Sequence, residues 1–163
     1  EEKLSPHYET FEIGKAEVLR EGADGALLAY GAMVYRCLQA AEKLSEKGIE
    51  VTVVNARFVK PLDKELILEL IRNHKLIITA EDHALMGGFG SAVLELVSDE
   101  RENVNKILRM GIPDCFIEHG PRNLMLKNIG LDEGGIADKF ITTLDLMNIR
   151  GSFTKTGKQR LSV

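Results

Sequence analysis

The sequence predicts an α/β domain of three layers, in which helices cover both faces of a mainly parallel sheet of about five strands. Two observations predict this class. Short apolar runs rich in β-branched residues alternate with segments whose apolar residues recur at helical spacing. The first two runs are joined by a short turn, so we expect a hairpin that adds one antiparallel edge strand.

The chain begins its regular structure with this hairpin and a first helix. Residues 16–20 and 26–30 have the composition of strands, and the segment between them contains the turn residues Gly and Asp. An apolar stripe at helical spacing starts at Met33. Gly48 stands where a glycine commonly ends a helix, so we expect this helix to stop there.

Two further strand–helix units follow in the middle of the chain. Residues 49–56 and 75–80 are apolar runs that predict buried strands. Between them, Asp63 is a candidate N-cap for a helix whose apolar face is formed by Leu66, Ile67, Leu70 and Ile71. A third helix follows the glycines near residue 88, with an apolar face formed by Phe89, Val93, Leu96 and Val97.

The last third of the chain predicts one strand and two helices. Residues 104–110 form a short strand. Pro121 opens a short helix, because its missing N–H costs nothing in the first turn, and Gly130 closes it. Asp132 caps a final helix with one apolar stripe, made of Ile136, Phe140, Ile141, Leu144 and Met147.

These elements define one domain with two flanking segments. We expect residues 1–14 to be a linker, residues 15–149 the folded domain, and residues 150–163 a flexible basic tail. The tail holds four basic residues and no acidic residue. The sequence starts without methionine, and we therefore expect a processed or excised piece of a larger protein.

Composition limits the classes of function. A formal charge of −4 argues against nucleic acid as the main partner, and no apolar run is long enough to span a bilayer. Cys37 and Cys115 form no CxxC pair, so we interpret both thiols as packing residues in a reducing, cytoplasmic setting. Neither these cysteines nor the histidines form a zinc-binding pattern, and we expect no metal site.

The glycine-rich stretch around Gly87, Gly88 and Gly90 is the most distinctive segment. It fails the dinucleotide-binding fingerprint, because Val93 stands where the third glycine would fall. Two interpretations stay open. The glycines either let a helix start close against neighbouring backbone, or free N–H groups near Gly31, Gly88 and Gly90 bind an anion.

Glu81, Asp82 and His83 come a few residues before these glycines, just past the predicted strand 75–80. A carboxylate beside a histidine could perform acid–base chemistry. Adjacent residues of a strand point to opposite faces, however, so all three cannot converge unless the chain turns. We therefore favour a polar corner at a domain or subunit interface.

Five segments carry a resemblance to a known family. They are EIGKAEVLREGADGALLAYGAMV, NARFVKPLDKELI, EDHALMGGFGSAVLE, GIPDCFIEHG and IGLDEGGIADKF, and they span about Ile13 to Asn148. In this order they resemble the C-terminal, third domain of 1-deoxy-D-xylulose-5-phosphate synthases. More distantly, the pattern is similar to the C-terminal domains of transketolase and of the pyruvate dehydrogenase beta subunit.

The resemblance implies a homodimeric parent transferase that condenses pyruvate with glyceraldehyde 3-phosphate. The product, 1-deoxy-D-xylulose 5-phosphate, is a precursor of isoprenoids, thiamine and pyridoxal. Thiamine diphosphate, held by Mg²⁺, supplies the carbanion chemistry. In this family a Gly-Asp-Gly segment in the first domain binds the cofactor, and the present sequence contains no such segment.

We therefore expect neither a catalytic nor a cofactor-binding residue in this chain, and we expect the isolated chain to be inactive. The resemblance implies a structural domain that packs on the first two domains of the same enzyme. The expected interface residues are those matching the family's glycine-rich corner, Glu81, Asp82, His83, Gly87, Gly88, Phe89 and Gly90. The alternatives are a free-standing regulatory or anion-binding module, and the equivalent domain of a transketolase-like enzyme.

Overall fold

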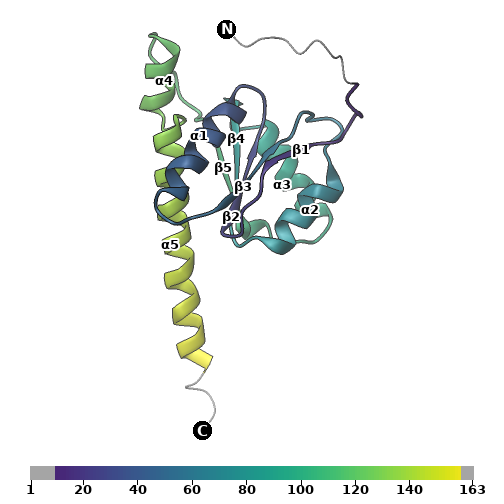
Figure 1. Ribbon diagram of the computed structural model, residues 1–163, viewed down its shortest axis with the longest axis vertical. Coiled ribbons are helices and arrows are strands. Elements are labelled where there is room, and N and C mark those ends of the chain that lie inside the picture. The colour runs from purple at the N-terminus through teal and green to yellow at the C-terminus, as the bar shows by residue number, and fades with distance from the viewer. Residues whose placement is uncertain (1–9, 159–163) are drawn as a thin grey trace.

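A computed structural model describes the backbone of residues 10–158 and the side chains of residues 10–148. It contains a five-stranded sheet with the order β1-β3-β2-β4-β5 (Figure 1). β1 is antiparallel to β3, and every other neighbouring pair is parallel. The predicted fold class is confirmed, including the single antiparallel edge strand.

The elements alternate as the apolar pattern predicts. In chain order they are β1 (Glu17–Arg20), β2 (Gly25–Ala29), α1 (Met33–Ser45), β3 (Val51–Asn55), α2 (Lys64–Asn73), β4 (Ile77–Ala84), α3 (Phe89–Asp99), the 3-10 turn η1 (Val104–Lys106), β5 (Ile107–Ile112), α4 (Arg122–Asn128) and α5 (Glu133–Lys158). The predicted strand at 104–110 is therefore partly wrong. Its first three residues form η1, where the Asn103 side chain accepts a hydrogen bond from the backbone of Asn105.

The predicted hairpin between the first two strands is also wrong, because β3 lies between β1 and β2. The segment joining them is bound to the start of β3. The Thr52 hydroxyl donates to the carbonyl of Gly22 and accepts from its N–H. The Asp24 carboxylate accepts from the N–H of Glu50. A β-carbon at Gly22 would overlap the backbone of Val51, so the chain can pass this closely only as glycine.

Helices cover both faces of the sheet (Figure 1). One face packs against α1, α4 and α5, in a core that includes Leu27, Met33, Leu44, Ile136 and Phe140. The other face packs against α2 and α3, in a core that includes Leu28, Val54, Ile71, Phe89 and Val93. β2, β3 and the first half of β4 are buried on both sides, which explains why their sequences are almost continuously apolar.

Three of the helix ends predicted from capping residues are confirmed, namely those at Asp63, Asp132 and Gly48. Asp63 accepts a hydrogen bond from the N–H of Leu66 at the start of α2, and Asp132 accepts one from the N–H of Gly135 at the start of α5. Gly48 adopts φ +76° after α1, a conformation that favours glycine.

Helix α5 is longer than expected. It continues through Lys158, across the first part of the segment assigned to a basic tail. Its 26 residues correspond to about 39 Å, and its far end projects beyond the sheet (Figure 1). Residues 1–9 of the expected linker and 159–163 of the tail lie outside the described residues.

Candidate functional site

The acidic corner belongs to a strand. β4 extends to Ala84, so Glu81, Asp82 and His83 lie inside its second half, not beyond its end as predicted. Alternation along the strand places Glu81 and His83 on one face and Asp82 on the other. Glu81 is completely buried, whereas the His83 ring is 69% exposed. Asp82 points away from both and forms an ion pair with Arg122 of α4.

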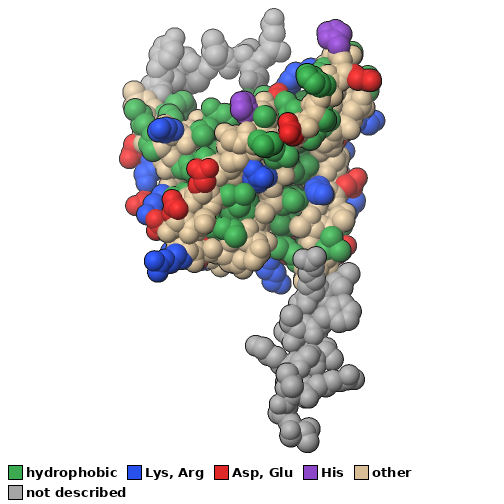
Figure 2. All heavy atoms as spheres, turned by 180° about the vertical axis from the view of Figure 1, so that it is seen from behind, with side chains coloured by type: hydrophobic (Ala, Val, Ile, Leu, Met, Phe, Trp, Pro, Cys, Tyr) green, Lys and Arg blue, Asp and Glu red, His purple; other side chains and the backbone are tan. Residues whose placement is uncertain are grey.

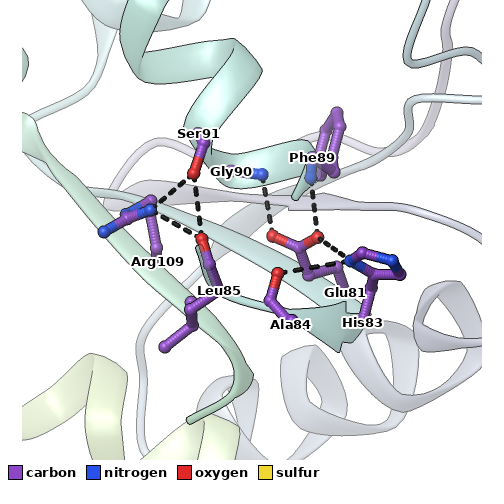
Figure 3. Close-up of polar contacts among 8 residues, drawn as sticks. All are labelled: Glu81, His83, Ala84, Leu85, Phe89, Gly90, Ser91 and Arg109. Carbon is purple, nitrogen blue, oxygen red and sulfur yellow. Dashed lines mark hydrogen bonds and ion pairs between the residues drawn. The ribbon is translucent and has the colours of Figure 1, made fainter. Parts of the chain in front are cut away.

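The Glu81 carboxylate caps helix α3. Its two oxygens accept hydrogen bonds from the N–H groups of Phe89 and Gly90, at 2.6 and 2.8 Å (Figure 3). The α3 N-cap residue is Gly88, which has no side chain to fill this role. The strand therefore supplies the capping group, and the positive end of the helix compensates a buried negative charge.

Two glycines make this approach possible. A β-carbon at Gly88 would overlap the Glu81 carboxylate and the Ala84 carbonyl, and one at Gly90 would lie 2.6 Å from the Thr79 hydroxyl. Gly87 has open space around it but adopts φ +70°, so its requirement is conformational. This geometry agrees with the interpretation that the glycines let the helix start close against neighbouring backbone.

The same geometry affects the alternative interpretation, in which free N–H groups near Gly31, Gly88 and Gly90 bind an anion. At α3, the amides of Phe89 and Gly90 already bind Glu81, so an external anion would have to displace a buried carboxylate. At α1, Gly31 adopts φ +61° directly before a helix with no side-chain cap and no acidic residue in its first turn. The two predicted positions therefore differ, because only the α3 amides are satisfied by a side chain of this chain.

His83 and Glu81 do not form a hydrogen-bonded acid–base pair. The His83 Nδ1 atom lies 4.0 Å from the nearer carboxylate oxygen of Glu81 and 3.3 Å from the Ala84 carbonyl. A general base needs a heavy-atom distance of about 2.6–3.2 Å to its partner. The carboxylate is also engaged by two backbone amides, so its geometry is that of a cap.

Arg109 completes the corner and was not predicted from the sequence. From β5, its guanidinium donates to the Leu85 carbonyl and to the Ser91 hydroxyl, each at 2.8 Å (Figure 3). The Ser91 hydroxyl also donates to the Leu85 carbonyl, at 2.9 Å. Ser91 thus has a structural role in this corner. The only sequence signal for Arg109 is a charged residue within an apolar strand.

Six of the seven predicted interface residues line one hollow of about 360 Å³; Gly90 is the exception. It opens at the carboxyl ends of β2 and β4, where open α/β sheets commonly bind ligands. Tyr30 and Phe89 form part of its wall, with stacked rings whose centroids lie 5.6 Å apart. Tyr30, which directly follows the end of β2, was also not predicted as a site residue.

Metal ligands do not cluster in the described part of the chain. Within residues 10–158, no group of three or more His, Cys, Asp and Glu residues is arranged to hold a metal ion. None of the described helices is long and apolar enough to cross a membrane. Cys37 is buried, as expected, but Cys115 is exposed, so its interpretation as a packing residue is wrong.

Comparison with known proteins identifies the class of domain. A family model described as the transketolase C-terminal domain matches residues 14–136, most of the sheet and its helices. The chain belongs to this family. The expected resemblance is thereby confirmed at the level of the fold and the domain.

Curated relatives that match the chain are named 1-deoxy-D-xylulose-5-phosphate synthases. The chain is 54% identical over 125 residues to synthase 1 of Geobacter sulfurreducens, covering 77% of this chain and 20% of the relative. It is 49% identical over 145 residues to the synthase of Synechococcus sp. (strain JA-2-3B'a(2-13)), covering 89% and 22%. The chain therefore spans about a fifth of the length of the curated relatives it matches.

Solved structures share the fold. A structure described as a split gene transketolase, inactive beta4 tetramer, is 34% identical with a TM-score of 0.79, covering 90% of this chain and 47% of that one. A Pichia stipitis transketolase variant is 18% identical with a TM-score of 0.59, covering 82% and 18%. The second likeness shows the fold alone.

Proposed function

We propose that this chain is the C-terminal domain of a 1-deoxy-D-xylulose-5-phosphate synthase. The parent enzyme condenses pyruvate with glyceraldehyde 3-phosphate and releases carbon dioxide. The observation that carries the proposal is the identity of about 50% with several such synthases, which extends over most of the chain. The likeness to solved transketolases is weaker, at 34% identity for the split gene transketolase and 17–18% for the Pichia stipitis transketolases, so a synthase is favoured over a transketolase-like parent.

The described residues do not fit thiamine diphosphate and its Mg²⁺. The amides at the start of α3, the best diphosphate-binding group of the corner, hold the Glu81 carboxylate. Asp82 is paired with Arg122, and the described residues offer no cluster of metal ligands. We therefore place the cofactor, and every step of the reaction, in the rest of the enzyme.

The domain itself serves assembly. The polar groups of its corner already have partners within the chain. Glu81 caps helix α3, Arg109 donates a hydrogen bond to the Leu85 carbonyl, and Asp82 forms an ion pair with Arg122. Such groups hold the shape of a surface, and the buried carboxylate is itself engaged by two backbone amides. The partners proposed for that surface are the first two domains of the same chain, within a homodimeric enzyme in the cytoplasm.

A domain exchange tests this function. The region of the Geobacter sulfurreducens synthase that matches this chain is replaced by it, and formation of 1-deoxy-D-xylulose 5-phosphate is measured. We expect turnover within about tenfold of the parent synthase, whereas the synthase without this region is inactive. A soluble but inactive hybrid would contradict the proposal.

A regulatory module is the second candidate, because the hollow of about 360 Å³ is preformed. It predicts that the isolated chain binds a small anion beside Gly31 and that deleting the chain changes regulation of the enzyme but not its basal turnover. The domain exchange separates the two candidates, because an assembly domain is needed for basal turnover itself.

A further inference from the structure

Three neighbouring hollows lie along one edge of the domain, at the carboxyl ends of the four parallel strands. The hollow of about 360 Å³ lies between β2 and β4. A second, of about 750 Å³, follows β2 and β3 and shares Tyr30 and Gly31 with the first. A third, of about 390 Å³, follows β4 and β5 and includes Met86 and Phe116. We call this face, formed by the three hollows, the carboxyl-edge face.

Large apolar side chains are exposed on this face. Phe116 is fully exposed, Met86 is 70% exposed, and Phe11 is 61% exposed. Six of the ten large hydrophobic residues that are exposed in the described part of the chain line these hollows, namely Phe11, Leu19, Tyr30, Tyr35, Met86 and Phe116. Exposed apolar patches of this kind commonly mark contacts between proteins. Hydrophobic side chains are visible along the upper end of the molecule in Figure 2, the end at which α4 lies in Figure 1.

Charged groups on the carboxyl-edge face are mostly compensated within the chain. Glu17 pairs with Arg57 at 2.6 Å, Asp82 pairs with Arg122, and Glu81 binds backbone amides. The face therefore has no basic patch of the kind that would attract nucleic acid or an anionic membrane. An apolar centre with paired charges around it suits a protein partner instead.

The polypeptide enters the domain at this face. The Phe11 ring lies under the guanidinium of Arg57, 4.2 Å from the ring centroid, beside the carboxyl end of β3. The matching family is a C-terminal domain, and the curated relatives are about five times longer than the region matched. In such a synthase, the preceding four fifths therefore connect to this domain beside Phe11.

We infer that the carboxyl-edge face is the docking surface for the preceding part of the synthase. The inference rests on the proposed function and adds to it which face of the domain contacts the partner and which side chains anchor that contact. Met86 and Phe116 are the anchors, because they are large hydrophobic side chains that line the third hollow and are 70% and fully exposed. The hollow between β2 and β4 then receives side chains of the partner, beside Asp82 and its ion pair with Arg122.

Hydrogen exchange tests the docking face in the hybrid enzyme described above, with the isolated chain as reference. We expect amides of residues 84–89 and 112–116 to exchange about tenfold more slowly in the hybrid. The double variant Met86→Asp and Phe116→Asp should return these rates to within about threefold of the isolated chain. Leu146→Asp is the matched control, since Leu146 is 54% exposed but lies on α5, about 20 Å along the helix from its start. It should leave the protection unchanged.

The outcomes separate the inference from the proposed function. An active hybrid whose carboxyl-edge amides exchange as in the isolated chain overturns the docking face and leaves the domain assignment standing. Protection that is already complete in the isolated chain, with the mass of a dimer in solution, also overturns it, because a second copy then occupies the face. An inactive, unassembled hybrid overturns the proposed function itself, and the inference falls with it.

Discussion

The carboxylate of Glu81 lies 2.6 Å from the backbone nitrogen of Phe89, and this contact joins strand β4 to helix α3. A completely buried acid thereby stabilises the start of a helix whose own N-cap residue is a glycine. This contact gives Glu81, the carboxylate that the sequence offered for acid–base chemistry, a structural role as the cap of helix α3.

Replacing Glu81 by glutamine should destabilise the domain. Gln keeps the shape but turns one acceptor into a donor, so one of the two amides loses its partner in a buried site. We expect a loss of about 1–3 kcal/mol in the free energy of unfolding, measured with urea. Glu95→Gln on the exposed side of α3 is the control and should change stability by less than about 0.5 kcal/mol. Equal effects of the two substitutions would refute the capping role.

Gly88→Ala tests the close approach of α3 to β4. The added methyl group would overlap the Glu81 carboxylate and the Ala84 carbonyl, neither of which can move freely. We expect a loss of about 1–3 kcal/mol. Gly120→Ala is the matched control, because its methyl group would lie 3.8 Å from the Met125 side chain, an ordinary contact. A Gly88→Ala protein as stable as the Gly120→Ala protein would show that the corner is loosely packed.

Arg109→Met should loosen the segment between β4 and α3. Met keeps part of the apolar stem but removes both donors, leaving the Leu85 carbonyl with the Ser91 hydroxyl only. We expect amides of residues 85–88 to exchange several-fold faster, while those in the middle of β2 keep their rates. Unchanged exchange at 85–88 would mean that the arginine does not hold this segment.

Stability should fall as the pH is lowered from 7.5 to 5.5. Burial lowers the pKa of His74, whose Nδ1 atom has no hydrogen-bond partner, and nearby Lys106 lowers it further. The unfolded chain, with a pKa of about 6.5, then binds the proton more readily than the folded chain. The stabilisation is thus present above the unfolded pKa and is lost as the pH falls below it. The urea midpoint of a His74→Gln variant should vary less over this range; an equal slope would contradict the assignment.

The two cysteines should react differently with a thiol reagent. Burial raises the pKa of the Cys37 thiol to about 12, whereas Cys115 is exposed. We expect one fast-reacting thiol per folded chain and none in a Cys115→Ser variant. A second equally fast thiol in the native protein would show that the core around Cys37 opens readily.

The sequence predicted the sheet, its helices and several caps because these follow from local patterns. β-branched runs, helical stripes and residues such as Asp63 and Asp132 act within a few positions of the chain. The position of β3 between β1 and β2 was missed, since it depends on contacts such as Thr52 to Gly22 across 30 residues. Apolar periodicity carries no information on such pairings.

The sequence predicted most of the residues that form the site but not how they are arranged. Six of the seven residues named as interface candidates do meet at one hollow, while Tyr30, which follows β2, and Arg109, which lies in β5, were missed because they are distant from these residues in the sequence. The extension of β4 through Glu81 was also missed, since acidic residues are rare in buried strands. Its cap on α3 is a contact eight residues along the chain, which spacing alone does not reveal.

Calorimetric titration of the isolated chain with thiamine diphosphate and Mg²⁺ tests the central claim most directly, namely that this domain holds structure and not cofactor. The account predicts no saturable heat at micromolar cofactor, and no change when Glu81 is replaced by glutamine. Tight, metal-dependent binding to the isolated chain would contradict it.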